Sequence, residues 1–125
     1  METFFDAIRA SAGNSFAWET VIPVMFNGDY DPGFAMELAC KDMWLAYNLG
    51  RDLQVPLPLH GLVEQMMQMA RLKYGNDAGC YIYPKLLADT AGIDMHVDGW
   101  EDWNYSLEHV DGSAVIIHKN RPENK

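Results

Sequence analysis

The sequence is poor in cysteine and in basic residues, and it has no long apolar run. Two cysteines, Cys40 and Cys80, are too few for a disulfide framework, so we expect both to be reduced. Nine Lys and Arg against 18 Asp and Glu give a formal net charge of −9. This charge argues against nucleic acid or an anionic membrane surface as a partner. No segment approaches the roughly 20 apolar residues of a membrane span, and we expect a soluble, cytoplasmic protein.

Several catalytic signatures are also missing. The chain has no G-x-S-x-G nucleophile elbow, no Walker loop and no H-E-x-x-H metal motif. No G-x-G-x-x-G follows a strand, so the chain carries no dinucleotide-binding fingerprint of its own. His60 and His118 are single histidines, for which a surface or capping role is the usual explanation.

What is present is a chain of 125 residues with 49% hydrophobic content, enough for one ordinary domain. Apolar spacing predicts a mostly helical fold, an all-α bundle with an irregular or short-β tail. The expected helices cover residues 2–12, 15–26, 32–53, 59–74 and 81–90. Asn14 or Ser15 should cap the second, which Pro23 should bend or shorten, and Gly75 and Gly92 should end the last two.

The third expected helix, residues 32–53, is apolar on most sides, which predicts a buried central helix. Asp31-Pro32 is a strong helix start, because the carboxylate can cap free amides and proline suits the first helical position. Within this helix Lys41 and Asp42 fall on or beside apolar faces, with Lys41 about 20° from Phe34 on a helical wheel. A buried, unpaired charge would be costly, so each of the two needs a partner or a cleft.

For Lys41 and Asp42 the spacing leaves two interpretations. Lys41 could form a simple i,i+4 pair with Glu37, which is the better interpretation from spacing alone. Asp42 resists that explanation, because its neighbours on the wheel are apolar. A structural carboxylate and a functional one remain equally acceptable there.

From residue 93 the character of the chain changes, and we divide it into a domain at 1–92 and an acidic, aromatic tail at 93–125. The tail holds the chain's only strand-like run, residues 114–117. The tetrapeptide His-Val-Asp-Gly occurs twice, at 96–99 and 109–112. Two Asp-Gly turns explain it best. The alternative is a metal site built on His96, Asp98, His109 and Asp111, but the tail has no Cys and lacks the tight ligand spacing of known sites, so we expect no metal.

The order of several short motifs gives more specific information than the composition does. These motifs are Asp31-Pro32-Gly33-Phe34, Leu38, Lys41-Asp42, the run Val55-Pro56-Leu57-Pro58-Leu59, Tyr74-Gly75-Asn76-Asp77, and the upstream turn Ala10-Ser11-Ala12-Gly13-Asn14-Ser15. In this order the motifs resemble the C-terminal domain of the β-hydroxyacid dehydrogenases, the family of 3-hydroxyisobutyrate dehydrogenase and tartronate semialdehyde reductase. The resemblance covers about residues 1–92.

The resemblance implies a helical domain like that of 6-phosphogluconate dehydrogenase, which packs against a Rossmann domain. Between the two domains NAD or NADP exchanges hydride with a small β-hydroxyacid. It further implies that Lys41 reaches the nicotinamide end of the cofactor. Phe34 and Asp42 would line the substrate cleft. In this interpretation an interdomain cleft explains the charged residues on an apolar helix.

The resemblance also implies what this chain lacks. The family's catalytic lysine belongs to a segment that would precede Met1, and the Rossmann domain is absent. We therefore expect the isolated chain to bind no dinucleotide well, to be inactive, and to form homo-oligomers through its uncovered apolar surface. Its partner would be a Rossmann domain in cis or in trans. A second hypothesis keeps the fold but makes the chain a non-catalytic helical module for self-association.

Overall fold

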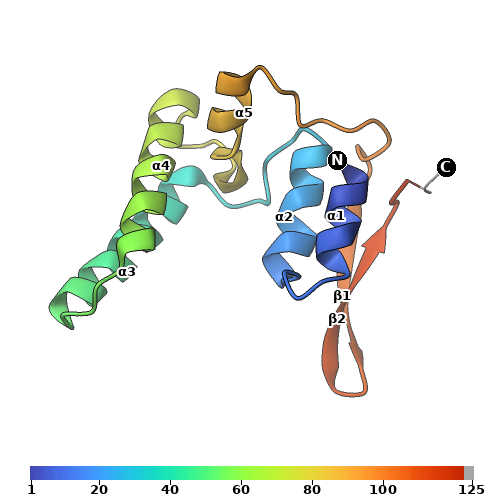
Figure 1. Ribbon diagram of the computed structural model, residues 1–125, viewed down its shortest axis with the longest axis horizontal. Coiled ribbons are helices and arrows are strands. Elements are labelled where there is room, and N and C mark those ends of the chain that lie inside the picture. The colour runs from blue at the N-terminus through green and yellow to red at the C-terminus, as the bar shows by residue number, and fades with distance from the viewer. Residues whose placement is uncertain (123–125) are drawn as a thin grey trace. The chain divides into compact units, whose positions relative to one another are not determined.

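The computed structural model describes residues 1–122 and confirms a mostly helical fold with a C-terminal hairpin (Figure 1). The elements are α1 (Glu2–Arg9), α2 (Phe16–Phe26), α3 (Met36–Asp52), α4 (Pro58–Tyr74), the 3-10 turn η1 (Cys80–Ile82), α5 (Lys85–Ala91), β1 (Asn104–Val110) and β2 (Ser113–Lys119). No helix within residues 1–122 is long and apolar enough to cross a bilayer.

The contacts divide the chain into two compact units. The first unit contains residues 1–30 together with the described part of the chain from residue 94, and the second contains residues 31–93. These bounds differ from the segments 1–92 and 93–125 expected from sequence, whose status as domains stays a prediction. Residues 123–125 of the expected tail lie outside the described residues.

In the first unit α1 and α2 form a short helical hairpin with an aromatic core. Ser15 accepts a hydrogen bond from the amide of Trp18 and is the N-cap of α2. Proline does not shorten this helix, which continues past Pro23 to Phe26. Phe5 is fully buried, and its ring lies 5.9 Å from that of Phe26 and 5.9 Å from that of Trp100. A tail residue, Trp100, therefore completes the core of the N-terminal helices.

The tail itself ends in an antiparallel hairpin, with Asn104 opposite Lys119 and Val110 opposite Ser113. The strand predicted at 114–117 is confirmed within β2. Asp111 and Gly112 both have positive φ, 51° and 82°, as a two-residue hairpin turn of matching twist requires. The second His-Val-Asp-Gly copy is therefore the turn that the sequence predicted.

A buried polar network ties β2 to α2 in the first unit. The Trp103 indole N–H donates to His118 Nδ1 at 3.1 Å, so the remaining ring proton is assigned to Nε2. That Nε2–H donates to Glu19 Oε2 at 2.8 Å, and Arg9 Nε donates to the same oxygen at 3.1 Å. His118 thus has a structural role inside the unit and not the surface role expected from sequence.

Glu19 makes the stability of the first unit depend on pH. Burial of the carboxyl raises its pKa, but the hydrogen bonds from Asn14, His118 and Arg9 outweigh burial and leave the pKa below its usual value of 4.5. A carboxyl with a lower pKa in the folded state stabilises the fold above its unfolded pKa. This contribution is lost as the pH falls through the folded value.

We therefore expect Glu19→Gln to lower the free energy of unfolding at pH 7 but to make little difference below the folded pKa of Glu19. Urea unfolding of both proteins between pH 7 and pH 3 checks this. Glu108→Gln, at an exposed position of β1, is the control and should match the parent throughout. The expectation would be contradicted if the free energies of unfolding of Glu19→Gln and the parent differed by the same amount at every pH.

The second unit is built around α3 and α4, which lie side by side (Figure 1). Its main hydrophobic cluster consists of buried residues from α3, α4 and η1: Met36, Ala39, Cys40, Met67, Ala70 and Cys80. Both cysteines are free, as expected from sequence, and both are buried. Burial raises the pKa of the Cys40 thiol. Burial, and to a smaller extent the negative charge of Asp31, raises the pKa of the Cys80 thiol to about 11. Neither thiol is therefore suited to act as a nucleophile.

The expectation that α3 starts at Asp31-Pro32 is wrong. Asp31 Oδ1 instead accepts the amide of Gly33 at 2.8 Å, and Gly33 has a φ of +77°, so this segment is a turn. The helix begins at Met36, whose amide donates to the carbonyl of Ala78 at 2.7 Å. Phe34 therefore precedes the helix, and its expected position on the helical wheel does not apply.

The expectation of a buried central helix is also wrong for α3. Only one of its faces is buried in the second unit, and large apolar side chains on the rest of its surface are exposed: Leu38, Trp44, Leu45, Tyr47 and Leu49. The fifth expected helix is broken in two, because Pro84 separates η1 from α5. Gly75 and Gly92 follow the ends of α4 and α5 with positive φ, as predicted.

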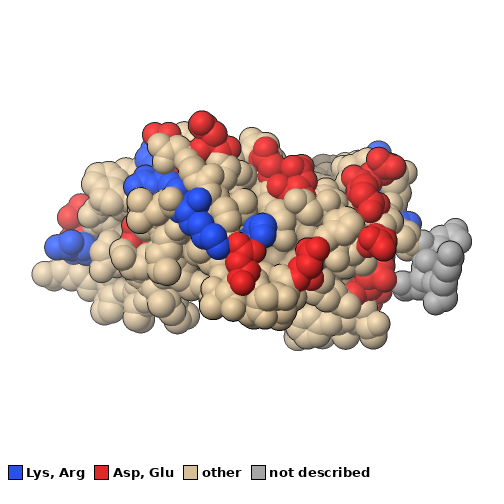
Figure 2. Space-filling model, turned by 90° about the horizontal axis from the view of Figure 1, so that it is seen from above, with Lys and Arg blue, Asp and Glu red and all other residues tan. Residues whose placement is uncertain are grey.

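Figure 2 shows one face of the molecule coloured by charge. On the face that Figure 2 shows, acidic side chains outnumber basic ones, and wide uncharged areas lie between them. The basic side chains on this face form no broad continuous patch (Figure 2). Such a surface offers little to a phosphate backbone.

Candidate functional site

Two segments distant in sequence meet at the N-terminus of α3. The turn before the helix pairs with the segment that follows α4, through an antiparallel bridge between Ala35 and Gly79. The amide of Cys80 donates to the carbonyl of Phe34 at 2.9 Å, and the amide of Glu37 donates to that of Asn76 at 3.1 Å. Backbone carbonyls thus satisfy the free amides of the first helical turn, a task that a side-chain cap usually performs.

This junction brings together the motifs Asp31–Phe34 and Tyr74–Asp77. Gly75 has a φ of +100°, a conformation that favours glycine, and it turns the chain after α4 toward the start of α3. The backbone pairing holds Phe34 directly before the helix. The two motifs therefore position the first turns of α3, on which Lys41 and Asp42 follow.

Lys41 and Asp42 form an ion pair with each other. Lys41 Nζ lies 3.1 Å from Asp42 Oδ1, and both side chains are 57% exposed. The i,i+4 pair with Glu37 considered for Lys41 is not among the ion pairs of residues 1–122. Phe34 is 38% exposed. The structure therefore places all three residues at the surface of the second unit.

The surroundings of Asp42 are apolar, as the helical wheel indicated, but they are not buried. Leu38, Leu45 and Leu49 lie on the same side of α3 as Asp42, and all three are exposed. An exposed apolar stripe interrupted by an ion pair differs from an ordinary solvated helix face. It has the composition of a surface that another molecule covers.

The Lys41–Asp42 pair itself is weak and can be opened. An exposed pair contributes about 0–1 kcal/mol, because water screens both charges. An anionic ligand group could therefore replace Asp42 at the Lys41 ammonium at little cost. Lys41 can serve as a cation for such a group, and Asp42 can orient it or accept a hydrogen bond.

Sequence reasoning missed the role of His60. Its Nε2 lies 2.7 Å from the carbonyl oxygen of Met43, and its ring stacks on that of Tyr47 at 5.9 Å. His60 therefore links α4 to α3 and is neither a simple surface residue nor a cap. The spacing of residues within one helix could not predict these contacts, because Met43 and Tyr47 lie on α3 and His60 lies on α4.

Asp89 was also missed. It receives hydrogen bonds from Lys73 at 2.7 Å, from Lys85, and from the Tyr74 hydroxyl at 2.9 Å. The two ammonium groups, with Lys73 the larger influence, hold the pKa of Asp89 well below its usual range. This network joins α5 to the end of α4 and has a structural role.

The two copies of His-Val-Asp-Gly have different surroundings. Among residues 1–122, the group of side chains with metal-ligand spacing is His96, Asp98 and Glu101, and it contains neither His109 nor Asp111. The four-residue metal site weighed from sequence is therefore not formed. Glu101 lies outside the repeated tetrapeptide, so the repeat in the sequence did not point to it.

Helices α1 to α4, the junction and the exposed apolar stripe of α3 all lie within residues 1–85. Residues 1–85 match the family model described as "NAD-binding of NADP-dependent 3-hydroxyisobutyrate dehydrogenase". The chain belongs to this family, the β-hydroxyacid dehydrogenases, as the motifs indicated. The match includes the whole of α3 and α4 and ends before the tail.

Individual relatives give the same result. The chain is 36% identical over 69 residues to an L-threonate dehydrogenase of Cupriavidus necator, covering 55% of this chain and 23% of that protein. It is 37% identical over 71 residues to a 2-(hydroxymethyl)glutarate dehydrogenase of Eubacterium barkeri, covering 56% of this chain and 24% of that protein. An L-threonate dehydrogenase of Escherichia coli is 30% identical over 70 residues, covering 56% of this chain and 23% of that protein. The matches thus span less than a quarter of each relative.

Proposed function

We propose that this chain supplies the helical half of the active-site cleft of an NAD(P)-dependent β-hydroxyacid dehydrogenase. The other half is a dinucleotide-binding domain, in cis or in trans. The observation that carries the proposal is the exposed stripe of α3, where the Lys41–Asp42 pair lies among uncovered leucines within the family-matched region. A Rossmann domain packed on this stripe would bury the leucines and enclose the pair.

In this arrangement each of the three residues has a distinct task. The Lys41 ammonium reaches the nicotinamide end of the cofactor and donates hydrogen bonds to its oxygen atoms. Asp42, one residue further along α3, orients Lys41 and the groups beside it. Phe34 forms an apolar wall for the carbon skeleton of the hydroxyacid. The cofactor supplies the hydride chemistry, and the chain's residues bind and orient.

The proposal makes the isolated chain inactive and its activity dependent on a second domain. The names of the relatives support a small hydroxyacid, such as L-threonate or 2-(hydroxymethyl)glutarate, as the substrate class of the proposed enzyme. The cytoplasmic location and the self-association expected from sequence belong to the same proposal.

Reconstitution in trans tests it. The chain is mixed with the separately expressed Rossmann domain of a family member, extended to include the segment with the catalytic lysine. NAD(P)H formation is followed with L-threonate, 3-hydroxyisobutyrate and 2-(hydroxymethyl)glutarate. We expect activity only in the mixture. Lys41→Ala should raise the KM for the cofactor by about tenfold or more, the order expected when one charge contact is lost.

Arg51→Ala is the matched control, because Arg51 is a basic residue in the last turn of the same helix. It should leave the cofactor KM unchanged. No activity in any mixture, with both partners folded by circular dichroism, would overturn the proposal. Equal effects of Lys41→Ala and Arg51→Ala would remove Lys41 from the cofactor site.

One observation favours the second candidate, a non-catalytic self-association module. Trp44 is 57% exposed, and with Leu53 and Leu59 it adds to the uncovered apolar surface of α3 and α4. A second copy could cover this surface as well as a Rossmann domain could. Light scattering of the chain with and without the Rossmann domain separates the two: under the first proposal the added domain forms a mixed complex, and under the second it leaves the homo-oligomer unchanged.

A further inference from the structure

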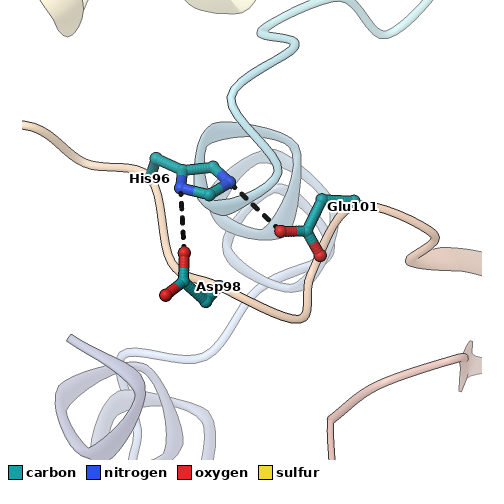
Figure 3. Close-up of side chains that lie close together, drawn as sticks. All are labelled: His96, Asp98 and Glu101. Atoms are coloured by element: carbon teal, nitrogen blue, oxygen red, sulfur yellow. Dashed lines mark ion pairs between the residues drawn. The ribbon is translucent and has the colours of Figure 1, made fainter.

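The loop between the second unit and the hairpin gathers three side chains that the dehydrogenase proposal does not use. His96, Asp98 and Glu101 each offer one ligand atom, and these atoms all lie within 4.8 Å of one another. Figure 3 shows the imidazole between the two carboxylates, with Nδ1 3.7 Å from Asp98 Oδ1 and Nε2 3.4 Å from Glu101 Oε1. All three residues lie beyond the family-matched region, which ends at residue 85.

We propose that His96, Asp98 and Glu101 bind a divalent transition-metal ion such as Zn²⁺. This departs from the sequence-based expectation of no metal, and it uses a different set of residues from the one weighed there. One imidazole nitrogen and two carboxylates form an N/O donor set that suits Zn²⁺. The proposal is independent of the dehydrogenase activity.

The separation of two of the three donor atoms fits such an ion. Zn²⁺ lies about 2.0–2.2 Å from imidazole nitrogen and carboxylate oxygen, so two ligands of a tetrahedral site are about 3.4 Å apart. His96 Nε2 and Glu101 Oε1 already have this separation, 3.4 Å. Asp98 faces the other ring nitrogen, and its fully exposed side chain is free to turn toward the ion. Water would complete the coordination.

The backbone holds the loop in place. The amide of Val97 donates to the carbonyl of Phe26 at 2.9 Å, which fixes the residue after His96 against the C-terminal end of α2. The amide of His96 donates to Asp94 Oδ1 at 2.9 Å. Gly28, with a φ of +80°, lies beneath the imidazole, and a Cβ there would come within 3.3 Å of His96 Cδ2. His96 therefore starts from an ordered position.

Most of the charge around this loop favours a cation; the exception is Arg121, whose guanidinium lies 5.5 Å from the centroid of the Trp100 ring. The last turn of α2 has no basic residue, and the partial negative charge of its carbonyl end faces the loop. Between Lys85 and Lys119 the chain has no Lys or Arg but carries several acids. A divalent cation would offset the mutual repulsion of Asp98 and Glu101.

The chain contains its own control for this site. His109 and Asp111 repeat the spacing of His96 and Asp98, but residue 114 is Ala where the first copy has Glu101. The second copy forms the hairpin turn and lies outside the cluster. If the third ligand and the loop create the site, only the first copy should bind.

The test uses the full chain without a histidine tag, treated with chelator and then titrated with Zn²⁺ by calorimetry and with Co²⁺ by absorption spectroscopy. We expect one ion per chain and a higher Tm when Zn²⁺ is present. His96→Ala should abolish both effects, and Glu101→Gln should weaken binding by about tenfold or more. His109→Ala should bind as the parent does.

Three results would overturn the proposal. The first is an absence of stoichiometric binding by a folded parent chain. The second is equal binding by the parent and His96→Ala, which would indicate an adventitious ion only. The third is an equal loss on His109→Ala. Because these readouts need no cofactor or substrate, their failure leaves the dehydrogenase proposal untouched.

Discussion

Trp100→Ala should unfold much of the first unit. Trp100 is 0% exposed, its ring lies 5.1 Å from that of Phe26, and its indole N–H donates to Glu2 Oε1 at 2.8 Å. Truncating a buried tryptophan to alanine costs about 3–5 kcal/mol. Since a domain is stable by only about 5–15 kcal/mol, the loss is a large fraction of the total. Urea unfolding followed by circular dichroism measures it.

Trp44→Ala is the control for this substitution. Trp44 is 57% exposed on α3, so its removal should change the free energy of unfolding by well under 1 kcal/mol in a monomeric sample. Comparable losses for the two variants would mean that the tail does not complete the core of α1 and α2. In that case the family-matched segment would fold without residues 94–122.

Gly50→Ala should destabilise the second unit although alanine is the better helix former. Gly50 is buried in α3, and a Cβ there would overlap Leu57 Cδ1 and lie 3.0 Å from Leu57 Cγ and 3.3 Å from the carbonyl oxygen of Val55. The Val55 backbone cannot move away easily, because its amide is bonded to the carbonyl of Gly50 at 2.8 Å. Overpacking costs about 1–3 kcal/mol, which exceeds the roughly 1 kcal/mol gained in helix propensity.

Gly61→Ala makes the same chemical change in α4 and should act in the opposite direction. A Cβ at Gly61 meets only the ring of Tyr47, at 3.6 Å, which is ordinary contact. The helix propensity of alanine should then raise the free energy of unfolding by up to about 1 kcal/mol. Thermal unfolding of both variants gives the comparison. If both variants shift Tm in the same direction, close packing at Gly50 is not what requires glycine there.

The residues of the candidate site could be predicted from sequence, but their burial and their contacts could not. The motif order identified the family and singled out Phe34, Lys41 and Asp42, whose roles stay predictions. The apolar surroundings of Asp42 were visible on the helical wheel. Whether those surroundings are buried or exposed depends on which elements pack against α3, and periodicity carries no information about that. The ion pair between Lys41 and Asp42 likewise depends on side-chain conformations.

The sequence by itself determined the features that rest on local signals. Ser15 caps α2, Gly75 and Gly92 end their helices, and Asp111-Gly112 forms a hairpin turn. Each of these depends on backbone preferences and hydrogen bonds within a few residues, so the local amino acids suffice.

Only the tertiary structure decided the features that need distant partners. Helix α3 starts at Met36 because the carbonyls of Asn76 and Ala78 satisfy its first amides, and no property of Asp31-Pro32 could reveal them. Trp100 belongs to the core of α1 and α2 because the chain folds back on itself. Long-range contacts of this kind follow from packing and the closure of long loops, which act on the whole chain at once.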